Sequence, residues 1–242
     1  MARVSSPIQL IYCYETTELL PHFTGNSLTV PKKNPGAAIE ILQELDARLA
    51  DVKITFVRRP WLRCLRDLAS GRVTAVIGSY SVERGEFASF PYSDGKLDKS
   101  FAFSKTETCL LQQKSAAIDW DGKKYTFAKQ HTIAIPRGYK LIKNLQAHGF
   151  DVYNASSASN AHELLFTRRV DASVSLCDFT AYPEYIVKNP IPIRTNHGYL
   201  MFSKVFFRQY SKLGGHIWQV LKGINKKAFY LKYQNYSMVA DN

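Results

Sequence analysis

Hydroxyl groups and an arginine follow an apolar run, residues 73–77, in a spacing suited to binding an anion. The run predicts a strand, and the hydroxyls after it are those of Ser79, Tyr80 and Ser81. Arg84 lies three residues beyond the last serine. Backbone N–H groups and serine hydroxyls can donate hydrogen bonds to an anion, and a guanidinium binds carboxylate or phosphate through two parallel bonds. We therefore expect an anion receptor here; a surface loop in which Arg84 pairs with a neighbouring glutamate is the alternative.

Short apolar strands alternate with amphipathic helices before this motif. The predicted strands are residues 8–13, 52–57 and 73–77, and the predicted helices begin at Pro35-Gly36 and at Trp61. Leu62, Leu65 and Leu68 are expected on the inner face of the second helix. A β-α-β-α-β order favours a mostly parallel sheet that binds ligands at the carboxyl ends of its strands.

The same order recurs in the second half of the chain. Here the predicted strands are residues 132–135, 150–153 and 170–174, and the predicted helices are 139–148 and 158–166. A short echo, Gly71 to Ala75 beside Arg169 to Ala172, closes a helix and opens a strand in both halves. We therefore expect an α/β protein of two similar lobes, each a mostly parallel sheet flanked by helices.

The segment GSYSVERGEFASFPY resembles a signature of type II periplasmic solute-binding proteins of amino-acid ABC transporters (extracellular solute-binding protein family 3). The preceding PWLRCLRDLASGRVTAV is similar to that family too. The resemblance implies that Ser79, Ser81 and Arg84 clamp the α-carboxylate of a ligand. It also implies two hinge crossings, one lobe of residues 1–104 and 197–242 and another of residues 105–196, and closure of the lobes around the ligand.

Further pocket residues are expected near the ends of the first two strands. Tyr14 and Glu15 end the first strand, where the resembled family places an aromatic side chain against the ligand, and core packing is the alternative for them. Trp61 follows the second strand and could form the floor of the pocket. Tyr80 lies between the two serines.

In the second lobe, Gly138 and Tyr139 occupy the turn where the resembled family shows Gly-Thr. The family's amine-binding aspartate, five residues after an Asp-Ala pair, corresponds to Leu176 in this chain. An ammonium group in a dry cleft needs an acidic or carbonyl partner. Either Asp178 or Glu15 meets that group, or the ligand is not a standard α-amino acid.

The chain is basic, with 32 Lys and Arg against 20 Asp and Glu and a net charge of +12. Nine of these basic residues and no acidic one lie between Tyr185 and Ala240. The stripe of Ile217, Val220, Leu221 and Ile224 predicts an amphipathic helix with a solvated basic side, which argues against nucleic acid as a partner. Anionic lipid or an acidic partner fits such a surface.

The four cysteines, Cys13, Cys64, Cys109 and Cys177, are far apart and have no metal-binding spacing. We interpret them as buried free thiols, although an oxidising compartment would permit disulfides. The six histidines are scattered. We expect neither a metal ion nor a cofactor.

No window approaches the roughly 20 apolar residues of a membrane helix, and the first ten residues lack the apolar centre of a signal peptide. Together with the resemblance, this predicts a periplasmic protein whose signal peptide has been removed. The predicted partners are a small ligand and a membrane ABC permease, and the predicted state is a monomer. A ligand sensor of the same fold is an alternative.

An enzyme similar to cyclohexadienyl dehydratases is a further alternative on this fold. It would need a general acid or base, and Glu15, Asp178 and His197 are the ionisable groups that we nominate. No spacing makes them a catalytic constellation, so we expect no enzymatic activity.

Overall fold

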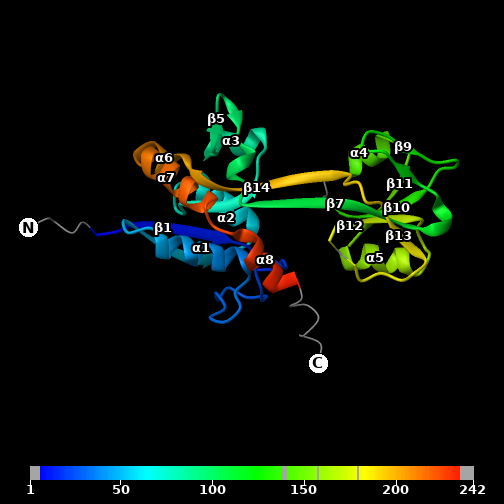
Figure 1. Cartoon of the computed structure of the whole chain (residues 1–242), viewed down its shortest axis with the longest axis horizontal. Coiled ribbons are helices and arrows are strands. Elements are labelled where there is room, and N and C mark those ends of the chain that lie inside the picture. Colours follow the sequence, from blue (N-terminus) through cyan, green and yellow to red (C-terminus); the bar gives the residue numbers. More distant parts are fainter. Residues whose placement is uncertain (1–5, 138–140, 157, 179, 235–242) are drawn as a thin grey trace, which may run out of the picture. The chain divides into compact units, whose positions relative to one another are not determined.

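The computed structural model describes residues 6–137, 141–156, 158–178 and 180–234 (Figure 1). The chain divides into unit 1, Met1–Lys105 with His197–Asn242, and unit 2, Thr106–Asn196. It crosses between the units in strands β7 (Ser104–Gln113) and β14 (Arg194–Ser203). Among the described residues, no helix has the length and apolar character needed to cross a membrane.

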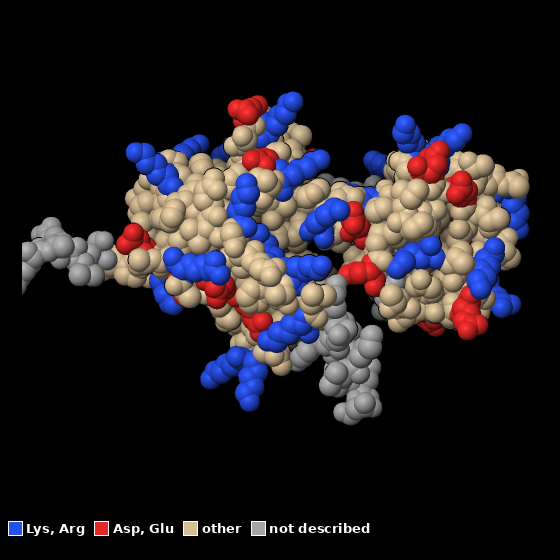
Figure 2. All heavy atoms as spheres, in the orientation of Figure 1, with Lys and Arg blue, Asp and Glu red and all other residues tan. Residues whose placement is uncertain are grey.

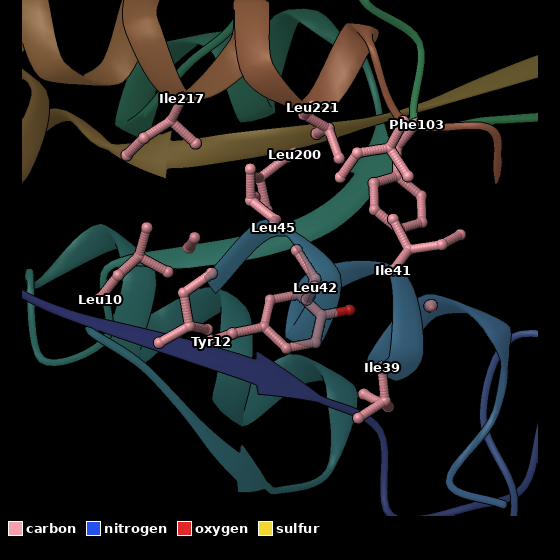
Figure 3. Packing of buried hydrophobic residues seen from close by; sticks show 14 of the residues in the cluster. Leu10, Tyr12, Ile39, Ile41, Leu42, Leu45, Phe103, Leu200, Ile217 and Leu221 are labelled. Carbon is pink, nitrogen blue, oxygen red and sulfur yellow. The ribbon is translucent and has the colours of Figure 1, made fainter. Parts of the chain in front are cut away.

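The sheet of unit 1 has the order β14-β3-β1-β2. Strands β1 (Ile8–Tyr14), β2 (Val52–Arg58) and β3 (Ala75–Ser79) are parallel, and β14 runs antiparallel to β3. Successive residues of a strand point to opposite faces, and β1 accordingly contributes Leu10 and Tyr12 to one hydrophobic cluster and Cys13 to another. Helix α1 (Ala37–Arg48) packs on the first of these faces (Figure 3), and α2 (Trp61–Ala69) packs on the second.

The other elements of unit 1 are short or belong to its C-terminal part. They are α3 (Val82–Phe87), β4 (Ala88–Ser89), β5 (Tyr92–Ser93), β6 (Lys96–Leu97), η1 (Lys99–Phe101), α6 (Lys204–Gln209), α7 (Ser211–Lys222) and α8 (Lys226–Gln234). The predicted amphipathic helix is confirmed in α7, which buries Ile217 and Leu221 in the cluster that contains α1. Lys and Arg outnumber Asp and Glu on the surface in view (Figure 2).

In unit 2, β10 (Thr132–Pro136) lies parallel to β11 (Asp151–Ala155) and β12 (Ala172–Leu176), while β7 runs antiparallel to β12. Helices α4 (Leu141–Ala147) and α5 (Ala158–Phe166) each pack in one of two hydrophobic clusters. The remaining elements are η2 (Lys114–Ala116), β8 (Asp119–Trp120), β9 (Tyr125–Thr126) and β13 (Ile186–Lys188). The predicted α/β class and strand-helix alternation are therefore confirmed in both halves.

The orientation of α2 differs from the prediction for one residue. Leu62 is 66% exposed, whereas Cys64 and Leu68 are fully buried. The half-buried Trp61 and Leu65 pack against the same cluster as these two residues. This face turns Leu62 outward, because a helix rotates by about 100° per residue.

All four cysteines form disulfides, so the interpretation as free thiols is wrong. Cys13 is bonded to Cys64 and joins β1 to α2 within unit 1. Cys109 is bonded to Cys177 and joins β7 to the residue after β12 within unit 2. Each bond links residues that are 51 or 68 positions apart, so only the pairing of the elements brings the sulfur atoms together.

Reduction of these bonds is expected to destabilise each unit by about 2 to 4 kcal/mol, because a disulfide restricts the unfolded chain. The measurement is the thermal unfolding midpoint with and without reductant. A variant with Cys13→Ala and Cys64→Ala is expected to lose stability and to respond less to reductant than the parent. An unchanged midpoint of the reduced parent would contradict this expectation.

Candidate functional site

The loop after β3 is organised by Ser81, which caps helix α3. The Ser81 Oγ accepts a hydrogen bond from the backbone N–H of Arg84 at 3.3 Å. Serine is a favoured cap because its oxygen satisfies an N–H group that has no partner within the helix. The cap therefore fixes where the arginine side chain leaves the helix.

The Arg84 guanidinium is held over the end of β3. Its Nη1 donates to the backbone oxygen of Ser79 at 2.7 Å and to the Ser79 Oγ at 3.1 Å. Its Cζ lies 5.4 Å from the centroid of the Trp61 ring, which places the cation within range of the aromatic system. Burial lowers the pKa of Arg84, yet a guanidinium stays charged in proteins.

Both hydrogen bonds of this side chain within the described part of the protein come from Nη1. A guanidinium has five N–H donors, so its Nε–Nη2 edge keeps the geometry that binds a carboxylate through two bonds. Arg84 forms no side-chain ion pair with the residues that the structure describes, so the arrangement can bind an anion without first breaking one.

Gly78 lies directly beside this group. A Cβ at Gly78 would lie 3.4 Å from both Arg84 Nη1 and Trp61 Cη2 and 3.0 Å from Met201 Cε. The spacing of hydroxyls and arginine in the sequence does not point to Gly78 or Met201. A glycine within an apolar strand is a signal for such close approach, whereas nothing near Met201 in the sequence connects it to residue 84.

Glu15 positions Trp61. Its Oε2 accepts the Trp61 backbone N–H at 2.8 Å, and its Oε1 accepts hydrogen bonds from the N–H and the hydroxyl of Thr16. Because the first N–H groups of a helix lack partners within it, the carboxylate stabilises the start of α2. Both oxygens thus have local donors, and a contact of Glu15 with a positive ligand group stays a prediction.

Within unit 1, Tyr14 does not join this group. Tyr14 is 1% exposed in the core of unit 1, where its ring packs against Tyr12 and Phe23 and lies 5.0 Å from Arg58 Cζ. Burial raises the pKa of its hydroxyl, which has no hydrogen-bond partner among the described residues. The structure thus favours the core-packing alternative for Tyr14.

Tyr80 is exposed, and its ring packs edge-on against Phe90 at 5.2 Å. Asp178 is exposed in the turn after β12 of unit 2. Gly138 and Tyr139 lie outside the described residues. Over the described ranges, no group of three or more His, Cys, Asp or Glu side chains could hold a metal ion.

No protein-family model and no curated protein sequence matches this chain. Its structure is similar to solved structures over nearly its whole length. A probable amino-acid ABC transporter extracellular-binding protein from Bacillus subtilis matches with a TM-score of 0.67 at 19% identity, covering 94% of this chain and 99% of that one.

A sensor domain and a second periplasmic domain also have similar structures. A histidine kinase sensor domain with similarity to periplasmic binding proteins has a TM-score of 0.60 at 12% identity, covering 95% of this chain and 96% of that one. The periplasmic VFT2 domain of Bordetella pertussis BvgS has a TM-score of 0.59 at 14% identity, with coverages of 93% and 92%. Since identities are below 20%, the likeness concerns the fold, and this chain has the fold of type II periplasmic-binding-protein domains.

Proposed function

We propose that this protein is an extracytoplasmic solute-binding protein that captures a small carboxylate-bearing ligand, an amino acid or a relative, for an ABC transporter. The observation that carries the proposal is the Arg84 guanidinium, which is fixed by Ser79 and Trp61 and keeps an edge suited to a carboxylate. Ser79 and Ser81 would complete the anion site, with Trp61 beside the ligand.

The proposal also uses the two units and their disulfides. Units 1 and 2 would be the lobes that close on the ligand, and a permease would recognise the closed form. One disulfide in each unit supports an oxidising compartment such as the periplasm. We place Asp178, Gly138 and Tyr139 on the lobe-two side of the site, and we propose a monomer that binds no nucleic acid.

Substitution of Arg84 tests the anion site. At a hundred times its dissociation constant a ligand adds about 2.7 kcal/mol of stability, so a panel of amino acids and small carboxylates is screened by thermal unfolding. Arg84→Ala is expected to abolish the shift given by any hit, because the ligand carboxylate loses its cation.

Arg48→Ala is the matched control, since Arg48 is exposed on α1 and pairs with Glu44. It is expected to keep the full ligand-dependent shift. If a hit stabilises the Arg84 variant as much as the parent, Arg84 does not belong to the binding site. Hits that lack an amine would show that the ligand class excludes standard α-amino acids.

A ligand-sensing domain is the second candidate, because a histidine kinase sensor domain shares the fold with a TM-score of 0.60. An immunoblot of source cells distinguishes the two functions. A transporter component would be detected at about the size of this chain, and a sensor domain would be detected within a longer polypeptide.

We propose no enzymatic activity. Turnover of a stabilising ligand by the purified protein would contradict this proposal and favour the dehydratase-like alternative.

A further inference from the structure

A group of arginines and two exposed aliphatic side chains lies on and beside α2 and on α6 of unit 1, and none of these residues belongs to the proposed site. We call it the arginine face. Its members are Arg59, Leu62, Arg63, Arg66, Arg72, Val205 and Arg208.

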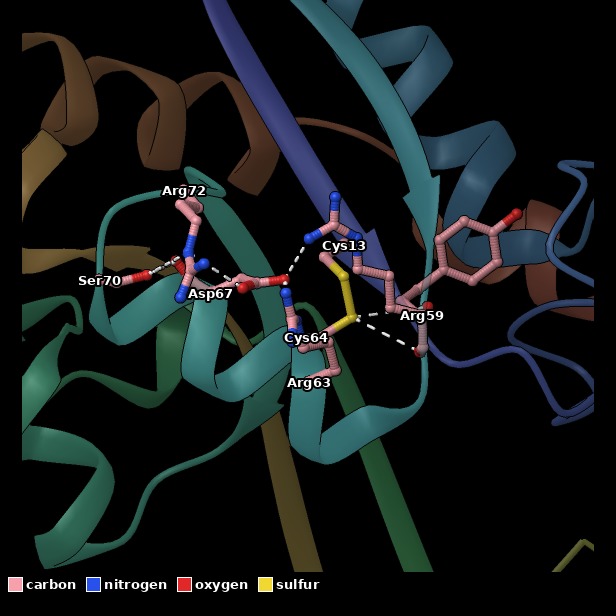
Figure 4. A network of polar contacts seen from close by, with 8 residues as sticks. Cys13, Arg59, Arg63, Cys64, Asp67, Ser70 and Arg72 are labelled. Atoms are coloured by element: carbon pink, nitrogen blue, oxygen red, sulfur yellow. Dashed lines mark hydrogen bonds and ion pairs between the residues drawn. A yellow bond between two sulfur atoms is a disulfide. The ribbon is translucent and has the colours of Figure 1, made fainter.

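Asp67 holds three of these arginines together (Figure 4). Its side chain is fully buried and forms ion pairs with Arg59, with Arg63 at 3.2 Å and with Arg72 at 3.3 Å. The three arginine side chains are 39%, 53% and 62% exposed. One carboxylate balances one of three positive charges, so a net charge of +2 stays at the surface on side chains that are already positioned. Such positioning lowers the entropy lost when an anion binds.

Exposed aliphatic side chains accompany the cations. Leu62 is 66% exposed and lies four residues before Arg66, so the two share a side of α2. Val205 is 54% exposed, and its Cγ atoms lie 3.1 Å from the position of a Cβ on Gly71, just beyond the end of α2. Arg208 follows Val205 by three residues and is exposed on the same side of α6. The face therefore extends from α2 onto α6.

The two segments contain almost no compensating negative charge. Residues 59–72 include one acidic residue, the buried Asp67, and residues 204–209 include none. Guanidinium groups bind phosphates through paired hydrogen bonds. Aliphatic side chains beside basic ones are typical of protein surfaces that insert into the headgroup region of a bilayer.

We propose that the arginine face docks onto an anionic phospholipid bilayer. The arginines would bind lipid phosphates, while Leu62 and Val205 would contact the apolar boundary beneath them. An acidic peptide would explain the arginines but not the exposed aliphatic side chains. Docking requires no solute, so its test can fail or succeed independently of the proposed solute binding.

Cosedimentation with vesicles tests the proposal. We expect binding to phosphatidylcholine vesicles that contain phosphatidylglycerol, no binding to pure phosphatidylcholine, and weaker binding as salt is raised. Arg63→Gln with Arg66→Gln is expected to weaken binding roughly 30-fold, since each basic residue near an anionic surface contributes about 1 kcal/mol. Lys123→Gln with Lys124→Gln removes the same charge from exposed positions of unit 2 and is expected to change affinity less than 3-fold.

A second variant leaves the ion pairs of Asp67 intact. Arg66→Gln with Arg208→Gln is expected to weaken binding as strongly while keeping the thermal midpoint, and Leu62→Ser is expected to weaken binding without any change in charge. If the arginine variants and the lysine control lose vesicle affinity equally, the protein is attracted to the bilayer by its overall charge and not by the arginine face. That result would overturn the proposal. An absence of binding to phosphatidylglycerol vesicles, or release of the protein by an equal concentration of inorganic phosphate, would overturn it as well.

Discussion

Replacement of Gly36 by alanine is expected to destabilise the protein by about 3 to 5 kcal/mol, because a methyl group has no space at this position. Gly36 has a φ of +107° and precedes the first residue of α1. A Cβ there would lie 2.3 Å from the Phe23 Cα and 2.5 Å from the His22 backbone oxygen. Both neighbours are backbone atoms, so no change of rotamer relieves the clash. Urea unfolding monitored by tryptophan fluorescence measures the loss.

Gly215→Ala is the matched control for this prediction. Gly215 lies within α7, and a Cβ there would meet no atom within 4 Å. Alanine is favoured over glycine inside a helix, so this variant is expected to gain up to about 1 kcal/mol. Similar stabilities of the two variants would contradict the geometry described for the segment before α1.

Asp67→Asn is expected to destabilise the protein by about 2 to 3 kcal/mol. Loss of one partner from a fully buried pair costs about 3 to 5 kcal/mol, and the loss is smaller here because the arginines stay partly hydrated. Asparagine retains the size of the side chain but not its charge, so Arg59, Arg63 and Arg72 lose their common counter-ion. Urea unfolding at neutral pH measures the difference from the parent.

The effect of Asp67→Asn should depend on pH. Burial alone would raise the pKa of Asp67, but the hydrogen bonds and charges of Arg59 and Arg63 outweigh it and hold the pKa below its ordinary value of 3.8. The carboxylate therefore contributes its full stability above that ordinary value and loses it as the pH falls through the lower pKa of the folded state. The parent and variant should accordingly differ at neutral pH and converge in strong acid.

Glu44→Gln serves as the control for Asp67→Asn. Glu44 pairs with Arg48 on the exposed side of α1, and such pairs contribute about 0.5 kcal/mol or less. A loss of similar size in both variants, or a difference between Asp67→Asn and the parent that does not change with pH, would contradict the role assigned to the buried carboxylate.

Both sets of predictions concern elements that position the proposed site. Gly36 allows α1 to begin against the segment that contains Phe23, and α1 covers one face of the sheet. Asp67 lies in α2, the helix that presents Trp61 to Arg84. Their stability effects can be measured without knowledge of the ligand.

The sequence by itself determined the α/β class and the order of strands and helices. Both depend on local periodicity: alternate residues of β1 face opposite sides of the sheet, and apolar residues of α7 recur at helical spacing. The spacing of Ser79, Ser81 and Arg84 was also visible, because these residues lie within one strand-to-helix turn.

Only the tertiary structure decided how distant residues combine. It paired Cys13 with Cys64 and Cys109 with Cys177, buried Tyr14, and bonded Glu15 to the start of α2. Each of these interactions depends on tertiary contacts between distant elements, and local sequence patterns carry no information on such contacts. Burial, disulfide bonds and helix capping stabilise the chain through these long-range contacts. Such contacts can be identified only once the packing of the sheets and helices is known.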